Sequence, residues 1–503
     1  MSPYHASPPA VDTVAGQLPG FVEHFLARVA AASESVAIEL AGEHVVLTYG
    51  ELLGLTERLR GAFRELGVGE GDAVLMMLPS GPEFIAAFYA LASLSAVAVP
   101  ISPALTPFEL APILADARPR GAVVAGPASV AVLAAYPDLR FVLTTTEAAS
   151  AVRAVHLADL AARSSPLVPP AADTIVSCHF TYKGLGYPLG VLHRYASYSV
   201  ALDGGMARWT TPGEAGSHLA LLPQHPVYAL LAGVLLPLSL GARLIVVRRF
   251  EPRGVYDLLA QHRIRFACLV PPLFRALAAR PRPRGELHSH LQLLSGGSYL
   301  TPELTASVAD AIGVEPLQGY GLSETLPATV NYPGRRRAGT LGVPIDRRVL
   351  VRIVDAHGRD VPSGRVGEIV VGGPTVMAGF LGRPRETERF LRDGWFHTGD
   401  LGHLDQEGFL HFDGRSLPIT KCAAQMVDLV EIESLVRTHP SVVDARATVS
   451  VDAHGAERVA LSIVMHSRAS LTAGEVIDYC KLSLSRHKLP RTVRVIQRDE
   501  VAV

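Results

Sequence analysis

The residues best suited to chemistry lie in a glycine-rich stretch at 180–191, which reads Phe-Thr-Tyr-Lys-Gly-Leu-Gly-Tyr-Pro-Leu-Gly-Val. An apolar run with β-branched residues at 173–179 predicts a strand before it, and residues 192–195 can open a helix after it. Gly184, Gly186 and Gly190 allow the backbone to take positive φ and to approach a ligand closely. A glycine-rich turn between a strand and a helix presents successive N–H groups, so it can hold a phosphate. Many such turns bind nothing, and the rest of the chain has to support this interpretation.

The elements around this stretch follow the alternation of strands and helices that is typical of an open α/β sheet. Helices are expected at 21–32, 51–66 and 83–93, with Thr48 and Glu51 able to form a capping box. Apolar runs predict strands at 73–78, 96–100, 121–125, 141–144, 219–222, 242–247, 266–270 and 291–295. From about residue 341 the pattern changes to short strands and glycine turns, at 349–354, 367–372 and 408–413. After Arg415 a helix at 429–438, strands at 444–451 and 458–464, and a helix at 473–485 are expected.

This pattern predicts an α/β protein with two domains. The large N-terminal domain of open α/β sheets is expected at 1–414, with a β-rich subdomain at about 335–414. A small α+β domain is expected at 415–503, and residues 1–20 read as a loose arm. A chain of 503 residues is too long for one hydrophobic core, which agrees with this division.

Composition excludes several classes of function. The net charge of −1 argues against a nucleic-acid partner, because such proteins carry basic surfaces. Four cysteines without a CxxC pair fit the cytoplasm and predict no thiolate metal site. The longest apolar stretches are shorter than a membrane span, and the N-terminus has no pattern of a signal peptide, so no membrane association is expected.

Motifs along most of the chain resemble those of the adenylate-forming superfamily, which includes acyl- and aryl-CoA synthetases, peptide-synthetase adenylation domains and luciferases. Gln-Gly-Tyr-Gly-Leu-Ser-Glu-Thr at 318–325 resembles its adenine- and magnesium-binding loop. Trp-Phe-His-Thr-Gly-Asp-Leu-Gly at 395–402 resembles the loop whose aspartate holds the ribose. Similar matches lie at 339–344, 367–374, 413–415 and 427–433. Their order and spacing agree with the family.

The resemblance implies a role for each matching residue. Glu324 is expected to bind Mg²⁺, Thr325 the α-phosphate, Asp400 the ribose hydroxyls and Arg415 the ribose or a phosphate. Tyr320 offers a flat face to adenine. The expected nucleotide site also includes Thr181, Gly184, Gly186, Gly190, Gly297, Gly319 and Gly321. In isolation, Glu324 would read as a surface carboxylate and Asp400 as a turn residue.

The glycine-rich stretch departs from the family pattern Thr-Ser-Gly-Thr-Thr-Gly-x-Pro-Lys-Gly. Tyr182 stands at the serine and Leu189 at the lysine, so Thr181 is the one hydroxyl left and Lys183 the one cation. Lys183 is open to two interpretations: it contacts the phosphates, or it points to solvent. His225 stands one position before the family's pocket histidine, and either faces the acyl site or is a satisfied core histidine.

The C-terminal part departs further. The family places a catalytic lysine in a turn near the C-terminus, and the chain ends at Val503, a few residues before that turn. Pro418 stands at the hinge between the domains, where a fixed φ narrows rotation. Lys421 matches a family lysine and is counted, with Glu324, Thr325 and Lys183, among the expected catalytic residues.

The sequence therefore predicts an ATP-dependent, AMP-forming ligase that activates a small aromatic carboxylic acid in bacterial secondary metabolism. ATP and Mg²⁺ are the expected cofactors, CoA is doubtful, and a carrier protein or an amine are further acceptors. Two alternatives remain: a diazotase that joins nitrite to an aryl amine on the same scaffold, and a nucleotide-binding homologue without catalysis. Monomer and homodimer are both compatible with the sequence. The expected substrate pocket consists of His225, Tyr228, Gly296, Ser298, Tyr299 and Leu322.

Overall fold

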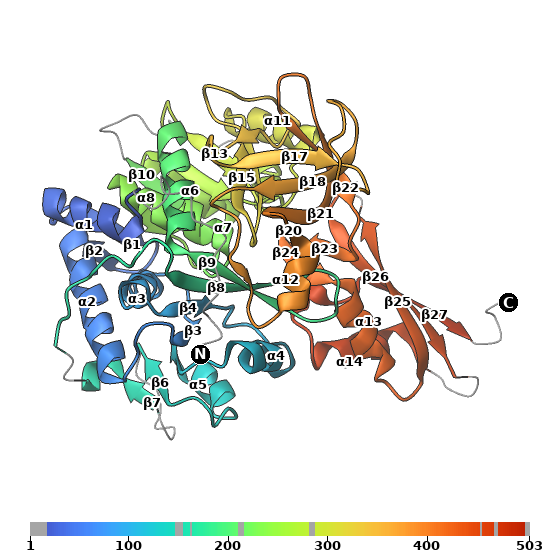
Figure 1. Cartoon of the computed structure of the whole chain (residues 1–503), viewed down its shortest axis with the longest axis horizontal. Coiled ribbons are helices and arrows are strands. Elements are labelled where there is room, and N and C mark those ends of the chain that lie inside the picture. Colours follow the sequence, from blue (N-terminus) through green and yellow to red (C-terminus); the bar gives the residue numbers. More distant parts are fainter. Residues whose placement is uncertain are drawn as a thin grey trace. The chain divides into compact units, whose positions relative to one another are not determined.

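The computed structural model describes residues 18–145, 154–160, 163–209, 216–280, 287–452, 455–466 and 471–497. Most of the N-terminal arm expected at 1–20 lies outside these ranges. The chain forms two compact units (Figure 1). The first consists of residues up to 103, 117–179 and 191–413, and the second of residues 104–116, 180–190 and 414–503. The glycine-rich stretch and a short helical segment thus pack with the C-terminal residues.

The first unit contains a largely parallel sheet of nine strands, apart from antiparallel pairs at its ends. Its order is β16 (Val343–Pro344), β15 (Leu326–Val330), β14 (Leu317–Leu322), β13 (Gln292–Ser295), β12 (Ile264–Leu269), β10 (Ser217–Ala220), β11 (Arg243–Val246), β1 (Val36–Leu40) and β2 (Val45–Thr48). The β14–β15 turn carries Glu324 and Thr325. This sheet therefore presents the predicted magnesium and phosphate ligands at one of its connections.

A second sheet of the first unit has eight strands. Its order is β19 (Gly379–Phe380), β9 (Leu189–Arg194), β8 (Ile175–Thr181), β4 (Val97–Pro100), β3 (Ala73–Met77), β5 (Gly121–Val124), β6 (Phe141–Thr144) and β7 (Ala154–His156). The glycine-rich stretch connects β8 to β9. The prediction that a helix opens at 192–195 is wrong for its first three residues, because Leu192–Arg194 continue strand β9 and the helix begins at Tyr195.

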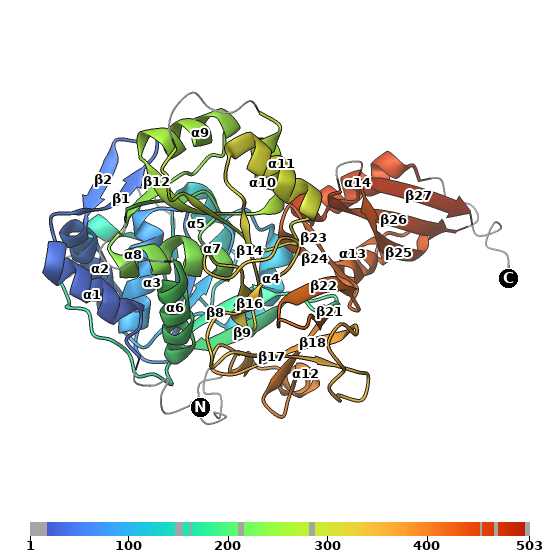
Figure 2. The same ribbon diagram turned by 90° about the horizontal axis from the view of Figure 1, so that it is seen from above.

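Helices pack on these sheets and supply much of the core. They are α1 (Phe21–Ala32), α2 (Tyr49–Glu65), α3 (Pro82–Ser93), α5 (Pro127–Leu133), α6 (Tyr195–Trp209), α7 (Val227–Leu230), α8 (Leu236–Leu240), α9 (Pro252–Gln261), α10 (Pro271–Ala278) and α11 (Pro302–Ile312), with 3₁₀ or π turns at Leu157–Asp159 and Leu231–Leu235. Helices α1, α2, α3, α6 and α8 lie together in Figure 2. The capping box of Thr48 and Glu51 is confirmed at the start of α2.

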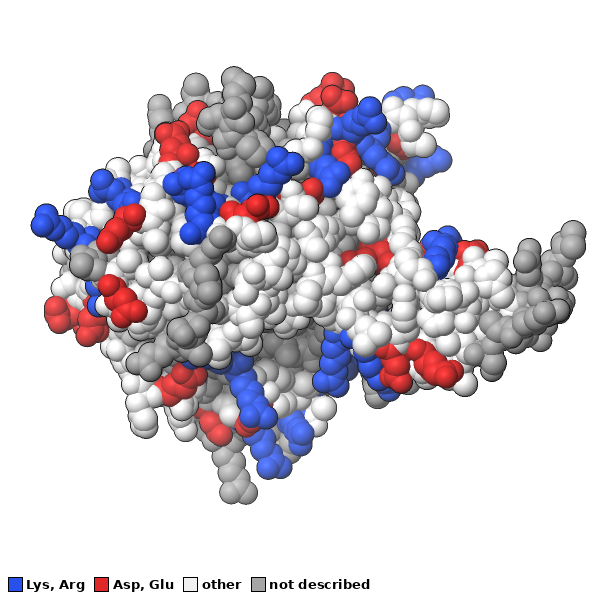
Figure 3. Space-filling model, turned by 90° about the horizontal axis from the view of Figure 1, so that it is seen from below, with Lys and Arg blue, Asp and Glu red and all other residues white. Residues whose placement is uncertain are grey.

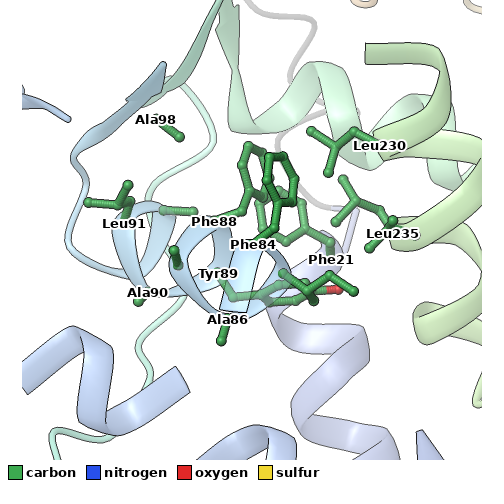
Figure 4. Close-up of a cluster of buried hydrophobic side chains, with 14 of the residues drawn as sticks. Phe21, Phe84, Ala86, Phe88, Tyr89, Ala90, Leu91, Ala98, Leu230 and Leu235 are labelled. Carbon is green, nitrogen blue, oxygen red and sulfur yellow. The ribbon is translucent and has the colours of Figure 1, made fainter. Parts of the chain in front are cut away.

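A large hydrophobic cluster joins both sheets through these helices (Figure 4). Phe21 of α1 stacks edge to face on Tyr89 of α3, with ring centroids 5.1 Å apart. Phe84 and Phe88 of α3 and Leu230 of α7 fill the same space. Each fully buried aromatic or leucine side chain of this kind contributes roughly 1.5–3 kcal/mol of transfer free energy. The cluster fixes the strands that carry the site.

A third sheet of the first unit is antiparallel. Its strands are β17 (Leu350–Val354), β18 (Gly367–Gly372), β21 (Trp395–Leu404) and β20 (Leu391–Arg392), with β22 (Leu410–Arg415) beside β21 and helix α12 (Pro384–Phe390) nearby. Strand β21 carries Asp400. The short strands predicted after residue 341 form this sheet.

The second unit has its own core. It contains the pair β23 (Ile419–Cys422) and β24 (Gln425–Asp428), the sheet β25 (Val442–Val451), β26 (Glu457–Met465) and β27 (Thr492–Gln497), helices α4 (Pro107–Ala117), α13 (Leu429–Arg437) and α14 (Ala473–Lys481), and a 3₁₀ turn at Arg486–Lys488. Helices α13 and α14 pack against the sheet and each other (Figure 2). The predicted fold class, a large α/β domain and a smaller C-terminal α+β domain, is confirmed.

Charged residues of both signs are interspersed on the face drawn in Figure 3. Within the described ranges, no helix has both the length and the apolar character needed to cross a membrane. All four cysteines are buried and free of disulfides.

Candidate active site

A tyrosine and an aspartate from two sheets of the first unit meet in a buried pair. The hydroxyl of Tyr320 on β14 donates a hydrogen bond to Oδ2 of Asp400 on β21, at 2.9 Å. Burial, and then the negative charge of Asp400, raise the pKa of Tyr320 well above its usual value. Tyr320 is therefore a neutral donor that orients the carboxylate. The alternative of a turn residue is wrong for Asp400, which lies inside a strand and is 5% exposed.

The turn between β14 and β15 holds Glu324 and Thr325 in place. The Thr325 hydroxyl accepts from the backbone N–H of Leu322 at 3.1 Å and donates to the carbonyl of Leu326 at 2.9 Å. The Glu324 carbonyl accepts from the N–H of Met377 at 2.7 Å. Glu324 is 1% exposed, so the alternative of a surface carboxylate is wrong.

This turn can supply one protein ligand to a Mg²⁺ ion whose other ligands come from a nucleotide and water. Within the described ranges, no cluster of three or more His, Cys, Asp or Glu side chains could hold a metal ion by itself. Mg²⁺ commonly takes one or two protein carboxylates and completes its shell with phosphate oxygens and water. Glu324 can supply one such carboxylate.

A buried histidine, which the sequence did not single out, supports the same turn. Nε2 of His193 on β9 lies 2.5 Å from the carbonyl oxygen of Ser323, the residue before Glu324. Burial lowers the pKa of His193 to about 4, so the ring is neutral at pH 7 and donates through Nε2. The sequence did not predict this contact because residues 192–195 read as the start of a helix, in which His193 had no assigned partner.

Two residues of the predicted substrate pocket pack directly on each other. The Tyr228 hydroxyl donates towards the carbonyls of Leu294 and Leu269, at 3.1 and 3.3 Å. A Cβ atom on Gly296 would lie 2.6 Å from Cζ of Tyr228, so only glycine allows the ring this position. Tyr228 therefore fills the space beside Gly296.

The other predicted pocket residues differ in burial and in hydrogen bonding. The Tyr299 hydroxyl donates to the carbonyl of Gly339 at 3.2 Å, and its ring lies 5.7 Å from that of Phe412. His225 is half-buried, and burial lowers its pKa to about 4. The Ser298 hydroxyl is buried and has no hydrogen-bond partner among the described residues. Leu322 is buried at the end of β14.

Most of the glycine-rich stretch, residues 180–190, belongs to the second unit and contacts C-terminal residues there. Gly184 has φ of 73°, and a Cβ there would lie 2.6 Å from Cδ of Pro418. The N–H groups after it bond a carboxylate: Leu185 N and Gly186 N donate to Oδ2 of Asp428 at 3.0 and 3.1 Å. Asp428 is not among the nucleotide-site residues that the sequence predicts.

Lys183 and Thr181, the charged and hydroxyl residues of this stretch, are both buried. Lys183 is 1% exposed and Thr181 is 5% exposed. The alternative in which Lys183 points to solvent is therefore wrong. The remaining predicted nucleotide-site glycines lie in β9 (Gly190), after β13 (Gly297) and in β14 (Gly319 and Gly321).

Tyr182 of the same stretch belongs to a buried ionic cluster that the sequence did not predict. Nζ of Lys488 lies 2.7 Å from Oε2 of Glu431, 2.9 Å from Oε1 of Glu109 and 3.0 Å from the Tyr182 hydroxyl. Burial disfavours the charged form of Lys488, but Tyr182 and the two carboxylates outweigh it and raise its pKa. We call these four residues the Lys488 cluster. It joins the glycine-rich stretch, α4 and α13.

Arg415 and Lys421 lie next to one acidic residue of the second unit. Nη1 of Arg415 forms an ion pair with Glu457 at 2.9 Å, and the backbone N–H of Lys421 donates to the same carboxylate at 3.0 Å. Burial acts to raise the pKa of Glu457, but Arg415 and these hydrogen bonds lower it overall. Arg415 is thus held by Glu457 in this arrangement.

Comparison with known proteins identifies the class. A profile of AMP-binding enzymes matches residues 25–381, and the chain therefore belongs to this family. It is an adenylate-forming ligase.

Relatives with 30% identity include an indoleacetate–CoA ligase of Aromatoleum aromaticum, with 89% of each chain covered. A feruloyl-CoA synthase of Amycolatopsis is also 30% identical, with 90% of each chain covered. The solved structure of the amide bond synthetase McbA from Marinactinospora thermotolerans is 25% identical, with a TM-score of 0.83 over 95% of this chain and 96% of that chain.

Proposed function

We propose that the protein uses ATP and Mg²⁺ to adenylate a small aromatic carboxylic acid and then transfers the acyl group to an amine. In this reaction a carboxylate oxygen attacks the α-phosphorus of ATP and pyrophosphate leaves. The amine then attacks the carbonyl carbon of the acyl adenylate, AMP leaves, and the amine loses a proton.

The observation that carries the adenylation step is the buried pair of Tyr320 and Asp400. A carboxylate oriented by a neutral phenol can accept hydrogen bonds from the two ribose hydroxyls. The turn that follows Tyr320 in the chain offers the Glu324 carboxylate for Mg²⁺, and Thr325 can donate to a phosphate once its hydroxyl leaves the carbonyl of Leu326. These roles are those that the family resemblance implies, and the burial of all four side chains supports them.

The contact between Tyr228 and Gly296 supports a short, flat acid. The tyrosine ring is fixed by two carbonyl acceptors and occupies the space that a bare glycine would leave open. A long acyl chain would have to displace this ring, whereas an aryl acid could stack beside it. The printed activities of the indoleacetate and feruloyl relatives agree with an aryl substrate.

Two observations support an amine acceptor over CoA. Pro418 stands at the position of the family's hinge, where its fixed φ narrows the rotation that thioester formation uses in this family. The amide bond synthetase McbA resembles this chain over nearly its whole length.

A pyrophosphate-release assay tests the proposal. A panel of aryl and aliphatic acids is supplied with ATP and Mg²⁺, with an aryl amine, with CoA, or with nitrite and an aryl amine. Release that depends on an aryl acid, with amide as the product, is expected. Release only with nitrite would instead support a diazotase, and no release under any condition would support a nucleotide-binding protein without catalysis; either result overturns the proposal.

Acid length gives a second readout from a single variant. Tyr228→Ala should widen acceptance to longer acids, because it empties the space beside Gly296. An unchanged preference for acid length would remove Tyr228 from the pocket.

A further inference from the structure

One carboxylate of the second unit bonds four backbone N–H groups. Oδ2 of Asp428 accepts from Leu185 and Gly186 of the glycine-rich stretch, at 3.0 and 3.1 Å. Oδ1 accepts from Val430 and Glu431 in the first turn of α13, at 2.9 and 3.3 Å. Asp428 is fully buried, so no water competes for these donors.

This arrangement is that of an anion bound to a glycine turn and a helix N-terminus. Consecutive N–H groups and the positive end of a helix both favour a negatively charged oxygen. A carboxylate oxygen and a phosphate oxygen accept from such donors in the same way. Asp428 thus occupies N–H groups of the glycine-rich stretch, the turn that the sequence predicts to hold a phosphate.

The close packing of the stretch supports this placement. Gly186 has φ of 84°, and a Cβ there would lie 3.1 Å from Cγ1 of Val430. Gly184 packs more closely still, since a Cβ there would lie 2.6 Å from Cδ of Pro418. The glycines permit the contact that brings Asp428 to the N–H groups, so the chain accommodates an internal anion at this position.

We infer that Asp428 is a specificity-determining residue for the nucleotide: it competes with the polyphosphate of ATP for the N–H groups of Leu185 and Gly186. Binding of the β- and γ-phosphates has to displace its carboxylate, and the two like charges repel each other at close range. AMP lacks these phosphates and does not meet this competition. The inference rests on the proposed function only in taking ATP as the physiological ligand.

Asp428→Asn tests the inference. Asparagine is as good a helix N-cap as aspartate, so its carbonyl can still accept from the first turn of α13. It removes the negative charge and offers an NH₂ group that cannot accept from the stretch. Asp444→Asn is the matched control, since it removes the same charge from the same unit at an exposed site bonded to Arg437. Calorimetry with Mg²⁺ measures the affinities for ATP, AMP and inorganic tripolyphosphate.

We expect Asp428→Asn to bind ATP and tripolyphosphate about tenfold more tightly than the wild type, since removing an internal competitor raises the competent fraction. AMP affinity should stay unchanged, and Asp444→Asn should behave as the wild type. Unchanged or weaker binding of ATP by the Asp428 variant would make Asp428 a purely structural cap and overturn the inference. So would an equal gain for ATP and AMP.

A second variant and the affinities for tripolyphosphate keep the outcomes distinct. Asp428→Ser is a shorter cap that cannot reach the stretch, and it replaces the first variant if that one does not fold. If the wild type binds tripolyphosphate but not ATP, the proposed function fails while the inference is still decided by the tripolyphosphate affinities. If it binds ATP and the variants match it, the inference fails while the proposed function stands.

Discussion

Removing Lys488 should strongly destabilise the second unit. The Lys488 side chain is 2% exposed, and its Nζ lies within 2.9 Å of carboxylate oxygens of both Glu431 and Glu109, whose side chains are 6% and 0% exposed. Lys488→Met keeps most of the volume but leaves two buried carboxylates without their counter-charge. Losing one partner of a buried ion pair costs about 3–5 kcal/mol, and this is the expected loss in the free energy of unfolding.

Urea unfolding followed by far-UV circular dichroism measures this loss, with Lys481→Met as the control. Nζ of Lys481 lies 2.8 Å from Asp478, but the pair is exposed, so its removal should cost less than about 0.5 kcal/mol. Adding Glu431→Gln to Lys488→Met removes one of the stranded charges and should restore part of the loss. A loss no greater than that of Lys481→Met would refute the assignment of the cluster as a buried ionic anchor.

The loss of stability in Lys488→Met should also depend on pH in a defined direction. The raised pKa of Lys488 means that its stabilisation is fully present below the ordinary pKa of lysine and is lost as the pH rises through the folded-state value. Burial already raises the pKa of Glu431 in the wild type. In Lys488→Met that pKa should rise further, so the deficit is largest at neutral pH and shrinks as the pH falls and the carboxylates take up protons. A deficit independent of pH between 7 and 5 would contradict this reasoning.

Three further predictions concern turnover, nucleotide binding and the rate of thioester formation. Glu324→Ala and Asp400→Ala should each reduce turnover by about ten- to a hundredfold, because each removes a charge-assisted contact worth about 1.5–3 kcal/mol; pyrophosphate release measures this, and full activity in a folded variant would withdraw the assignment. Lys183→Ala should weaken the binding of ATP more than that of AMP, since a buried cation in the glycine-rich stretch would face the outer phosphates; equal effects in calorimetry would argue against it. With Pro418 at the hinge, the rate of acyl-CoA formation should stay below about 1 s⁻¹. A higher rate in a thioester assay would show that the hinge still rotates.

The sequence by itself determined the fold class and most of the elements. Strands such as β3 and β4 are continuous apolar runs, and the helix α1 has the bounds that its spacing predicted. The capping box of Thr48 and Glu51 could be predicted because its hydrogen bonds span three residues. The motif around Glu324 and the motif around Asp400 could also be found, because each is a short local signature.

Tertiary structure alone decided which of these residues meet and what holds them. Tyr320 and Asp400 are 80 positions apart, and only the folding of two sheets brings the phenol to the carboxylate. Lys488 and Tyr182 are 306 positions apart, and Asp428 reaches Gly186 across 242. Hydrophobic periodicity records which side of an element is buried but not which distant side chain it faces. A charged residue that is buried by a remote partner therefore reads, in sequence, like one on the surface.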